Sequence, residues 1–223
     1  MTISHEGLPS MAVFSPQSKA PKEGYLDEVR SYLCGKVELR PLLDSIESLP
    51  NTWSYFAQHN SDIAALKQGI RHTQALSEWV KNGKSSGIAN VMSGILSLPL
   101  LTIIQVVQYF QFLEVKRLRH SDFMQQLRDM GGMQGYCGGL MPAIAIACSM
   151  TEAEVVANAC KAMKIALGIG AYGELGDDEN VLGPTTIVVR LKEEGQGEDA
   201  IKDFPDVSCS ILFLEVPKSL MYR

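Results

Sequence analysis

Hydrophobic residues recur at helical spacing along most of this chain, and short apolar runs punctuate that pattern near its start, middle and end. Leu42, Leu43, Ile46 and Leu49, for example, share one face of a helix expected over residues 39–48. The spacing predicts further helices at 25–34, 61–70, 73–81, 99–113 and 151–169, the last begun by the capping box Thr151 to Glu154. The apolar runs predict strands at 11–14, 133–136, 185–191 and 207–216.

A Gly- and Asp-rich stretch over residues 168–183 predicts a boundary between two subdomains, 1–182 and 183–223. After it, a strand, a short helix over 198–204 and a second strand would form a β-α-β unit, which is half of a ferredoxin-like fold. The expected fold class is therefore α/β, with an incomplete second subdomain. Two strands and one helix rarely bury enough surface to be stable alone.

Composition limits the function. The chain has 223 residues, of which 46% are hydrophobic, enough for one sizeable core. Its net charge of −5 argues against nucleic acid or an anionic membrane as partner. The five cysteines include no C-x-x-C pair, so neither a metal site nor a disulfide framework is indicated. Reduced thiols point to a cytoplasmic protein, and the start of the chain shows no secretory signal.

The most apolar window spans residues 95–112 and is interrupted by Gln105, Gln108 and Gln111. These amides favour a buried core helix over a membrane span.

Residues 135–139 read Gly-Tyr-Cys-Gly-Gly and lead directly into an apolar helix expected from about Gly138. Glycines around a reactive side chain, between a strand and a helix, are typical of a nucleophile elbow. The positive end of the helix dipole would stabilise negative charge on a thiolate or an oxyanion. Such a pentapeptide taken alone also fits a buried cysteine in a Gly-rich turn, and both interpretations stay open at this point.

Five blocks of sequence carry a family resemblance: residues 13–18 (Val-Phe-Ser-Pro-Gln-Ser), 90–101, 108–114, the Gly-Tyr-Cys-Gly-Gly elbow with the Leu-Met-Pro-Ala after it, and 183–186 with the following strand. In their order and spacing they resemble the starter-unit acyl-carrier-protein transacylase domain of fungal non-reducing polyketide synthases. The resemblance covers the chain to about Val207.

The resemblance implies a malonyl-transacylase-like fold, in which an α/β-hydrolase-like large subdomain carries a ferredoxin-like small one. It implies transfer of a starter acyl group from acyl-CoA or an acyl carrier to the carrier protein of the polyketide synthase. Cys137 matches the nucleophile, and the backbone N–H groups of Gly138 and Gln17 match the oxyanion hole. No bound cofactor or metal is implied, because CoA or phosphopantetheine enters with the substrate.

The resemblance also bears on the acyl group. Malonyl transacylases hold a free carboxylate with an arginine on the helix after the nucleophile, and this chain has no arginine between Arg128 and Arg190. An uncharged starter fits better, although Lys161 or Lys164 could substitute weakly; we expect both to be solvated. Lys116, Arg117 and Arg119 could meet an acidic carrier protein or form a solvated helix end.

The chain departs from the family in its histidines and its end. The family's general base is a histidine well after the nucleophile, whereas His5, His59, His72 and His120 all precede Cys137. We expect most of them to be exposed or capping residues, and we expect His120 to lie at a solvated helix end. The sequence after about Asp206 also departs from the family and stops early, as in a truncated or divided product. We therefore expect weak or no transacylase activity from this chain alone.

Two other functions stay open. The chain could be a non-catalytic remnant that binds a carrier protein or the remainder of a polyketide synthase. A cysteine hydrolase ranks last, because its histidine should follow the nucleophile.

Overall fold

The computed structural model describes residues 11–15, 21–89, 91 and 93–175, together with the backbone of strands 186–190 and 210–214. The chain divides into two compact units, Met1–Asp177 and Asp178–Arg223. The described residues are mostly helical and include two small parallel sheets. The chain is thus broadly α/β, as predicted, whereas its division at residue 182 and the ferredoxin-like half remain predictions.

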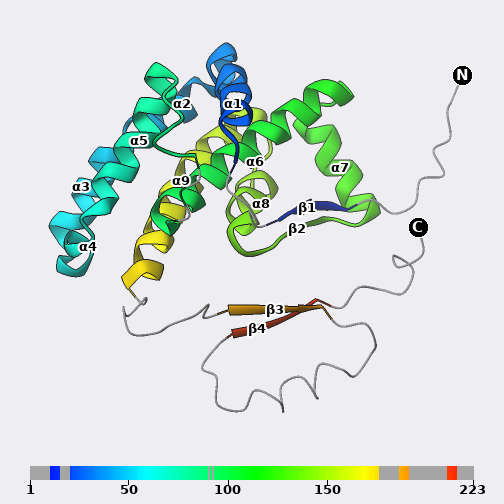
Figure 1. Cartoon of the computed structure of the whole chain (residues 1–223). Coiled ribbons are helices and arrows are strands. Elements are labelled where there is room, and N and C mark those ends of the chain that lie inside the picture. Colours follow the sequence, from blue (N-terminus) through cyan, green and yellow to red (C-terminus); the bar gives the residue numbers. More distant parts are fainter. Residues whose placement is uncertain are drawn as a thin grey trace, which may run out of the picture. The chain divides into compact units, whose positions relative to one another are not determined.

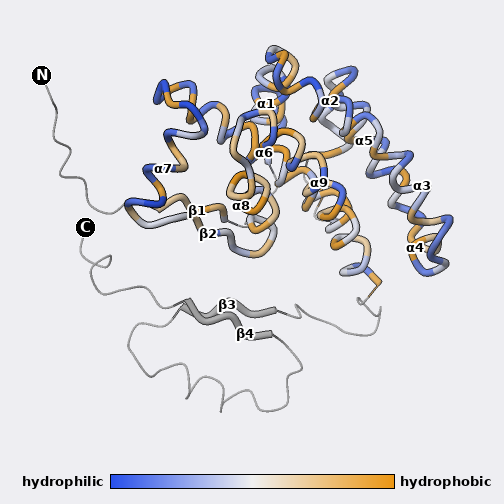
Figure 2. Tube along the Cα trace, turned by 180° about the vertical axis from the view of Figure 1, so that it is seen from behind, coloured by the Kyte–Doolittle hydropathy of each residue, from blue (hydrophilic) through white to orange (hydrophobic). Residues whose placement is uncertain are grey.

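The core of the first unit is built on two long helices, α6 (Gly94–Lys116) and α9 (Glu152–Leu175), which pack along each other (Figure 1). A third, short helix, α8 (Leu140–Ala147), packs against α9. The colouring of Figure 2 shows α6 and α8 as mostly hydrophobic and α7 (His120–Met130) as largely hydrophilic. Hydrophobic burial among α6, α8 and α9 therefore supplies much of the stability of the unit.

Among the described residues, α6 alone is long and apolar enough to cross a membrane by length and composition, and 67% of its most apolar window is buried inside the protein. Gln105 is buried in this helix, whereas Gln108 is exposed. These facts agree with the predicted core helix.

The start of α6 was predicted wrongly, because the helix begins at Gly94 and Pro99 lies inside it. The Ser97 N–H donates to the Ser93 carbonyl at 2.7 Å, so helical bonding is under way before the proline. The carboxylate of Glu174 accepts hydrogen bonds from the Ile95 N–H, at 3.2 Å, and from the Ser93 hydroxyl. A distant side chain thus satisfies donors at the start of the helix, a contact that local sequence does not reveal.

The predicted end of α9 was also too early, since the helix continues through its glycines to Leu175. A Cβ added to Gly170 would lie 2.2 Å from the carbonyl oxygen of Gly94. Glycine at both positions lets the two helix backbones approach closely. Gly94 and Gly170 are therefore packing glycines, and Gly170 lies inside α9 rather than beyond its end.

The remaining helices surround this core. They are α1 (Glu23–Gly35), the 3₁₀ turn η1 (Val37–Leu39), α2 (Arg40–Glu47), α3 (Leu49–His59), α4 (Ser61–Ala65), α5 (Gln68–Asn82) and α7. Helices predicted at 25–34, 39–48 and 73–81 are confirmed within a few residues, whereas α3 was not predicted.

Two helix ends in this layer have well-defined caps. The helix predicted from residue 61 to 70 is divided between α4 and α5. Asn60 caps α4, because its side chain accepts from the Asp62 and Ile63 N–H groups at 2.9 and 3.2 Å. Gly83 ends α5 with a left-handed φ of 72°.

The capping box before α9 is present in a modified form. The Glu154 N–H donates to the Thr151 hydroxyl at 3.2 Å, as a capping box requires. The Glu154 carboxylate, however, accepts from the N–H of Met150 at 2.7 Å, one residue earlier than the standard pattern.

Two pairs of parallel strands complete the described structure. Strand β1 (Ala12–Phe14) pairs with β2 (Met133–Gly135), and Val13 lies opposite Gln134. In the second unit, β3 (Thr186–Arg190) pairs with β4 (Ser210–Leu214). The strand predictions are confirmed in position. The helix predicted at 198–204 lies outside the described residues.

Candidate active site

The Gly-Tyr-Cys-Gly-Gly segment forms a sharp turn between β2 and α8. The Tyr136 N–H donates to the Phe14 carbonyl at 2.9 Å, which extends the pairing of β1 and β2 up to the turn. Cys137 then adopts a left-handed backbone, with a φ of 51°, and begins the 3₁₀ turn η2 (Cys137–Gly139). A side chain other than glycine pays about 1–2 kcal/mol for this conformation. The Cys137 thiol is exposed, which is the arrangement of a nucleophile elbow.

Two glycines of the motif are required by close backbone approach. A Cβ added to Gly139 would lie 2.3 Å from the carbonyl oxygen of Phe14. A Cβ added to Gly135 would lie 2.7 Å from the Gly139 oxygen and 2.7 Å from the Leu140 Cα. The turn therefore holds the end of β1, the end of β2 and the start of α8 in direct backbone contact.

The predicted oxyanion-hole residues are described only in part. Gly138 is buried and follows Cys137 in the 3₁₀ turn, where the first N–H groups have no partner within the turn. A Cβ added to Gly138 would meet the methyl groups of Leu101 and Leu98 at 2.8 and 3.0 Å. Gln17 lies outside the described residues, so its role stays a prediction.

The expectation that His120 lies at a solvated helix end is wrong. Its exposure is 0%, although it lies at the end of a basic stretch. Its Nδ1 lies 2.6 Å from the Tyr109 hydroxyl and its Nε2 lies 2.9 Å from the Ser149 carbonyl oxygen. A carbonyl only accepts, so Nε2 carries the proton and Tyr109 donates to Nδ1.

The backbone of His120 is held as firmly as its ring. Its N–H donates to the Glu152 carboxylate at 2.7 Å, and this hydrogen bond, as the main cause, lowers the pKa of Glu152. Burial raises the pKa of Tyr109. The cluster of His120, Tyr109, Ser149 and Glu152 thus links α6, α7 and the junction of α8 and α9.

The other histidines follow the expectation more closely. His59 is exposed, and its Nδ1 lies 2.8 Å from the Tyr55 carbonyl oxygen. His72 is half-buried, and desolvation lowers its pKa. His5 lies outside the described residues. Within the described part of the chain, no histidine hydrogen-bonds the Cys137 thiol.

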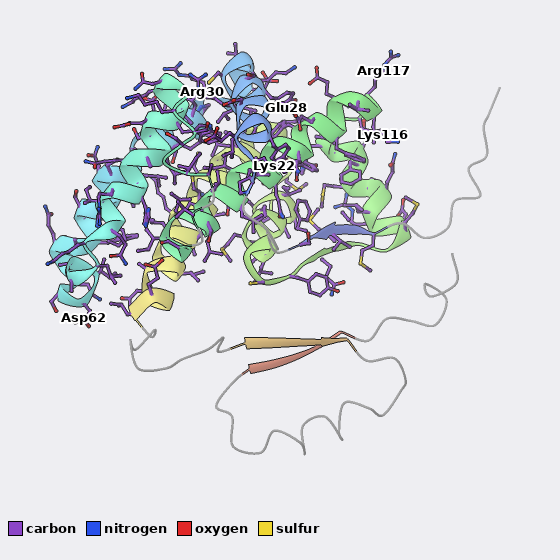
Figure 3. All side chains as sticks on the ribbon, viewed as in Figure 1. Lys22, Glu28, Arg30, Asp62, Lys116 and Arg117 are labelled. Atoms are coloured by element: carbon purple, nitrogen blue, oxygen red, sulfur yellow. The ribbon has the colours of Figure 1, made fainter. Side chains whose placement is uncertain are left out.

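Four of the five basic positions considered above are exposed, as expected for solvated side chains, and Lys164 is the exception. Lys116 and Arg117 lie at the C-terminal end of α6, on the outside of the first unit (Figure 3), and Arg119 forms an ion pair with Asp122 at 3.1 Å. Lys161 is exposed, whereas Lys164 is half-buried. Over the residues that the structure describes, no group of three His, Cys, Asp or Glu side chains could hold a metal ion.

Residues 46–206 match the family model described as "Starter unit:ACP transacylase in aflatoxin biosynthesis", or SAT. The chain belongs to the SAT family. This match covers most of the chain, including the elbow and the two long core helices, α6 and α9. The resemblance inferred from the sequence blocks is thereby confirmed.

Named relatives are fungal polyketide synthases. The chain is 82% identical over 212 residues to the non-reducing polyketide synthase atr1 of Stereocaulon alpinum, across 95% of its own length. It is 39% identical over 197 residues to Preu6 of Preussia isomera, across 88% of its length, and 49% identical over 153 residues to pks12 of Talaromyces marneffei, across 66%. The chain spans only 8–9% of the length of these synthases.

Proposed function

We propose that this SAT chain carries a starter acyl group as a thioester on Cys137 and passes it to the carrier protein of a polyketide synthase. The observation that carries the proposal is the left-handed backbone of Cys137, between a parallel strand and a helix. This conformation is costly away from glycine and is characteristic of elbow nucleophiles. The exposed thiol is open to an incoming thioester.

The reaction has two balanced halves. In the first, the Cys137 sulfur loses its proton and attacks the carbonyl of an acyl-CoA or acyl-carrier thioester; a new C–S bond forms, the donor's C–S bond breaks, and the donor leaves as a thiol with that proton. In the second, the phosphopantetheine thiol of the acceptor carrier protein attacks the acyl-cysteine, and the Cys137 thiol is restored. CoA and phosphopantetheine are thus substrates, and no resident cofactor takes part.

The negative charge on the carbonyl oxygen needs donors in both halves. We assign them to the backbone N–H groups of Gly138 and Gln17. Gly138 follows the nucleophile directly, and Gln17 follows the end of β1, which the turn holds against Gly139. The parallel pairing of β1 and β2 supports a malonyl-transacylase-like arrangement.

An uncharged starter is the proposed substrate class. A carboxylated acyl group would need a bidentate cation, and α9 carries no arginine. The exposed Lys161 Nζ lies 3.4 Å from the Asn158 side-chain oxygen on its own helix.

The test is intact-protein mass spectrometry after incubation with acyl-CoA thioesters from acetyl to octanoyl. We expect one acyl adduct on the chain, lost in Cys137→Ala and retained in Cys148→Ala. Cys148 is a matched control because it is an exposed thiol at the other end of α8, with an ordinary φ of −87°. A malonyl-CoA sample should give little adduct. An adduct that survives Cys137→Ala, or none from any thioester, would contradict the proposal.

The second half-reaction needs its own assay, because the histidines of this sequence all precede Cys137. Acylated protein is mixed with a phosphopantetheinylated carrier protein, and acyl transfer is followed by mass. We expect transfer to be much slower than acylation. Fast transfer would show that a positioned histidine is dispensable.

A further inference from the structure

The first turns of α6 pack against the elbow. A Cβ added to Gly138 would lie 3.0 Å from the Leu98 Cδ2 and 2.8 Å from the Leu101 Cδ2, so methyl groups of both leucines cover the Cα of Gly138. Gly138 is the residue whose N–H the proposed function assigns to the oxyanion. Leu101 is only 6% exposed, whereas Leu98 is half-buried. Leu98 therefore presents apolar surface to solvent at the turn that carries the exposed Cys137 thiol.

The helix on this side of the elbow is uncharged. From Gly94 to Leu113, α6 contains no Asp, Glu, Lys, Arg or His. Such a wall stabilises an apolar acyl chain by burial. It has no group to pair with a carboxylate, and burying an unpaired carboxylate is costly. The chemistry of the wall thus agrees with an uncharged starter, and Leu98 is the part of it that lies partly exposed against Gly138.

The turn that carries Leu98 is not held by its own helix alone. Pro99 has no N–H, so the helical hydrogen bond to the Ile95 carbonyl is missing. Ser93 stands at the N-cap, but its side chain makes no capping bond. A single turn before an internal proline is the part of a helix most easily displaced from the rest. The position of Leu98 therefore depends on an anchor outside α6.

Glu174, in the last turn of α9, supplies that anchor. Its Oε1 accepts hydrogen bonds from the Ile95 N–H, at 3.2 Å, and from the Ser93 hydroxyl. Its Oε2 accepts from the side-chain amide of Gln68 at 3.0 Å, so α5 holds the carboxylate in turn. One side chain thus connects the first turn of α6 to two other helices.

We propose that Leu98 is a specificity-determining residue for the acyl group and that Glu174 is its positioning residue. The inference rests on the proposed function, because it takes the acyl group to be carried on Cys137. The methyl groups of Leu98 contact the first carbons of an uncharged acyl chain and disfavour the carboxylate of a malonyl group. Glu174 acts through the first turn of α6 and keeps Leu98 against Gly138.

The first test locates Leu98 without acyl transfer. Methanethiosulfonates convert a thiolate to a mixed disulfide and release methanesulfinate, so their rates at Cys137 report the charge around the thiol. A sulfonatoethyl reagent, which is anionic, and a neutral methyl reagent are compared by peptide mass spectrometry. Leu98→Lys should raise the anionic-to-neutral rate ratio about fivefold, because its ammonium attracts the anion.

Val115→Lys is the matched control for the added charge. Val115 is an exposed apolar residue of the same helix, about 25 Å further along its axis. At that distance salt screens the new charge, so the rate ratio at Cys137 should stay almost unchanged.

The second test repeats the acylation assay with malonyl-CoA and hexanoyl-CoA. Leu98→Lys should shift the ratio of adducts on Cys137 about tenfold toward malonyl, whereas Val115→Lys should not shift it. Acylation with an unaltered adduct ratio in Leu98→Lys would overturn this inference alone. A chain that no thioester acylates would overturn the proposed function and this inference with it.

The third test addresses Glu174. Glu174→Gln keeps an oxygen that accepts from the Ile95 N–H and the Ser93 hydroxyl, whereas Glu174→Leu has none. Combined with Leu98→Lys, the glutamine variant should preserve the change in reagent ratio, and the leucine variant should reduce it to less than about twofold. General loosening alters both reagent rates together and largely cancels in their ratio. The inference is overturned if Leu98→Lys and Val115→Lys give equal ratios, or if Glu174→Leu preserves the full effect.

Discussion

The elbow around Cys137 and the cluster around His120 are both tightly constrained, but by different means. The elbow is defined by five consecutive residues, in which glycines permit the backbone contacts and one cysteine takes the unusual conformation. The His120 cluster joins residues as far apart as Tyr109 and Glu152. A constraint made by neighbours in sequence can be recognised as a motif, whereas one made across helices becomes visible only in the fold.

The largest expected effect comes from breaking the elbow at Gly139. Gly139→Ala places a Cβ against the Phe14 carbonyl, and because backbone cannot move aside as a side chain can, we expect a loss of about 4 kcal/mol in the free energy of unfolding. Urea denaturation measures it. Gly138→Ala is the control, since its Cβ meets only leucine methyl groups and should cost less than half as much. Equal losses would mean that the turn is not held against β1.

The next effect comes from the His120 cluster. His120→Ala removes two hydrogen bonds and leaves a cavity, so we expect a loss of about 3 kcal/mol, and about 1 kcal/mol for Tyr109→Phe. The exposed His59→Ala should stay within about 0.5 kcal/mol. In a double-mutant cycle, His120 and Tyr109 should be coupled. Additive losses would mean that His120 and Tyr109 stabilise the fold independently. The cluster would then not act as a single constraint comparable with the elbow.

The smallest expected effect is a pH dependence. The His120 N–H lowers the pKa of Glu152 below its ordinary 4.5, so the unfolded chain binds that proton more readily than the folded one. The resulting stability is present above pH 4.5 and is lost as the pH falls through the lower folded pKa. Thermal denaturation across this range should show a steeper acid-side loss for the unchanged protein than for Glu152→Gln. Parallel curves for the two proteins would mean that the Glu152 carboxylate does not contribute to the stability of the cluster.

The contrast explains which features could be predicted from sequence. The strand, turn and helix around Cys137 were predictable because each signal lies within a few residues of its effect. His120 was placed at an exposed helix end because its neighbours are Lys116, Arg117 and Arg119, and nothing local indicates that Tyr109 and Ser149 enclose it. Burial depends on which helices meet, and helical spacing alone does not determine that.

The errors at α6 and α9 share one cause. Pro99 and the glycines after Ile165 are local signals for a helix start and a helix end, and both were overridden by contact between the two helices. The unpredicted helix α3 contains Pro50 in its first turn. Proline and glycine thus indicate only a local preference for starting or ending a helix. Tertiary packing can follow that preference, as at Pro50, or override it, as at Pro99.

The contact between Glu174 and the start of α6 sets a lower limit on the length of a stable recombinant domain. The carboxylate that receives the Ile95 N–H and the Ser93 hydroxyl belongs to the penultimate residue of α9. A version trimmed after Gly173 would lose this interaction and loosen the start of a helix that lies 79 positions earlier in the sequence. A version trimmed after Leu175 would keep it, so the last two residues of α9 belong to the smallest fragment that retains the start of α6.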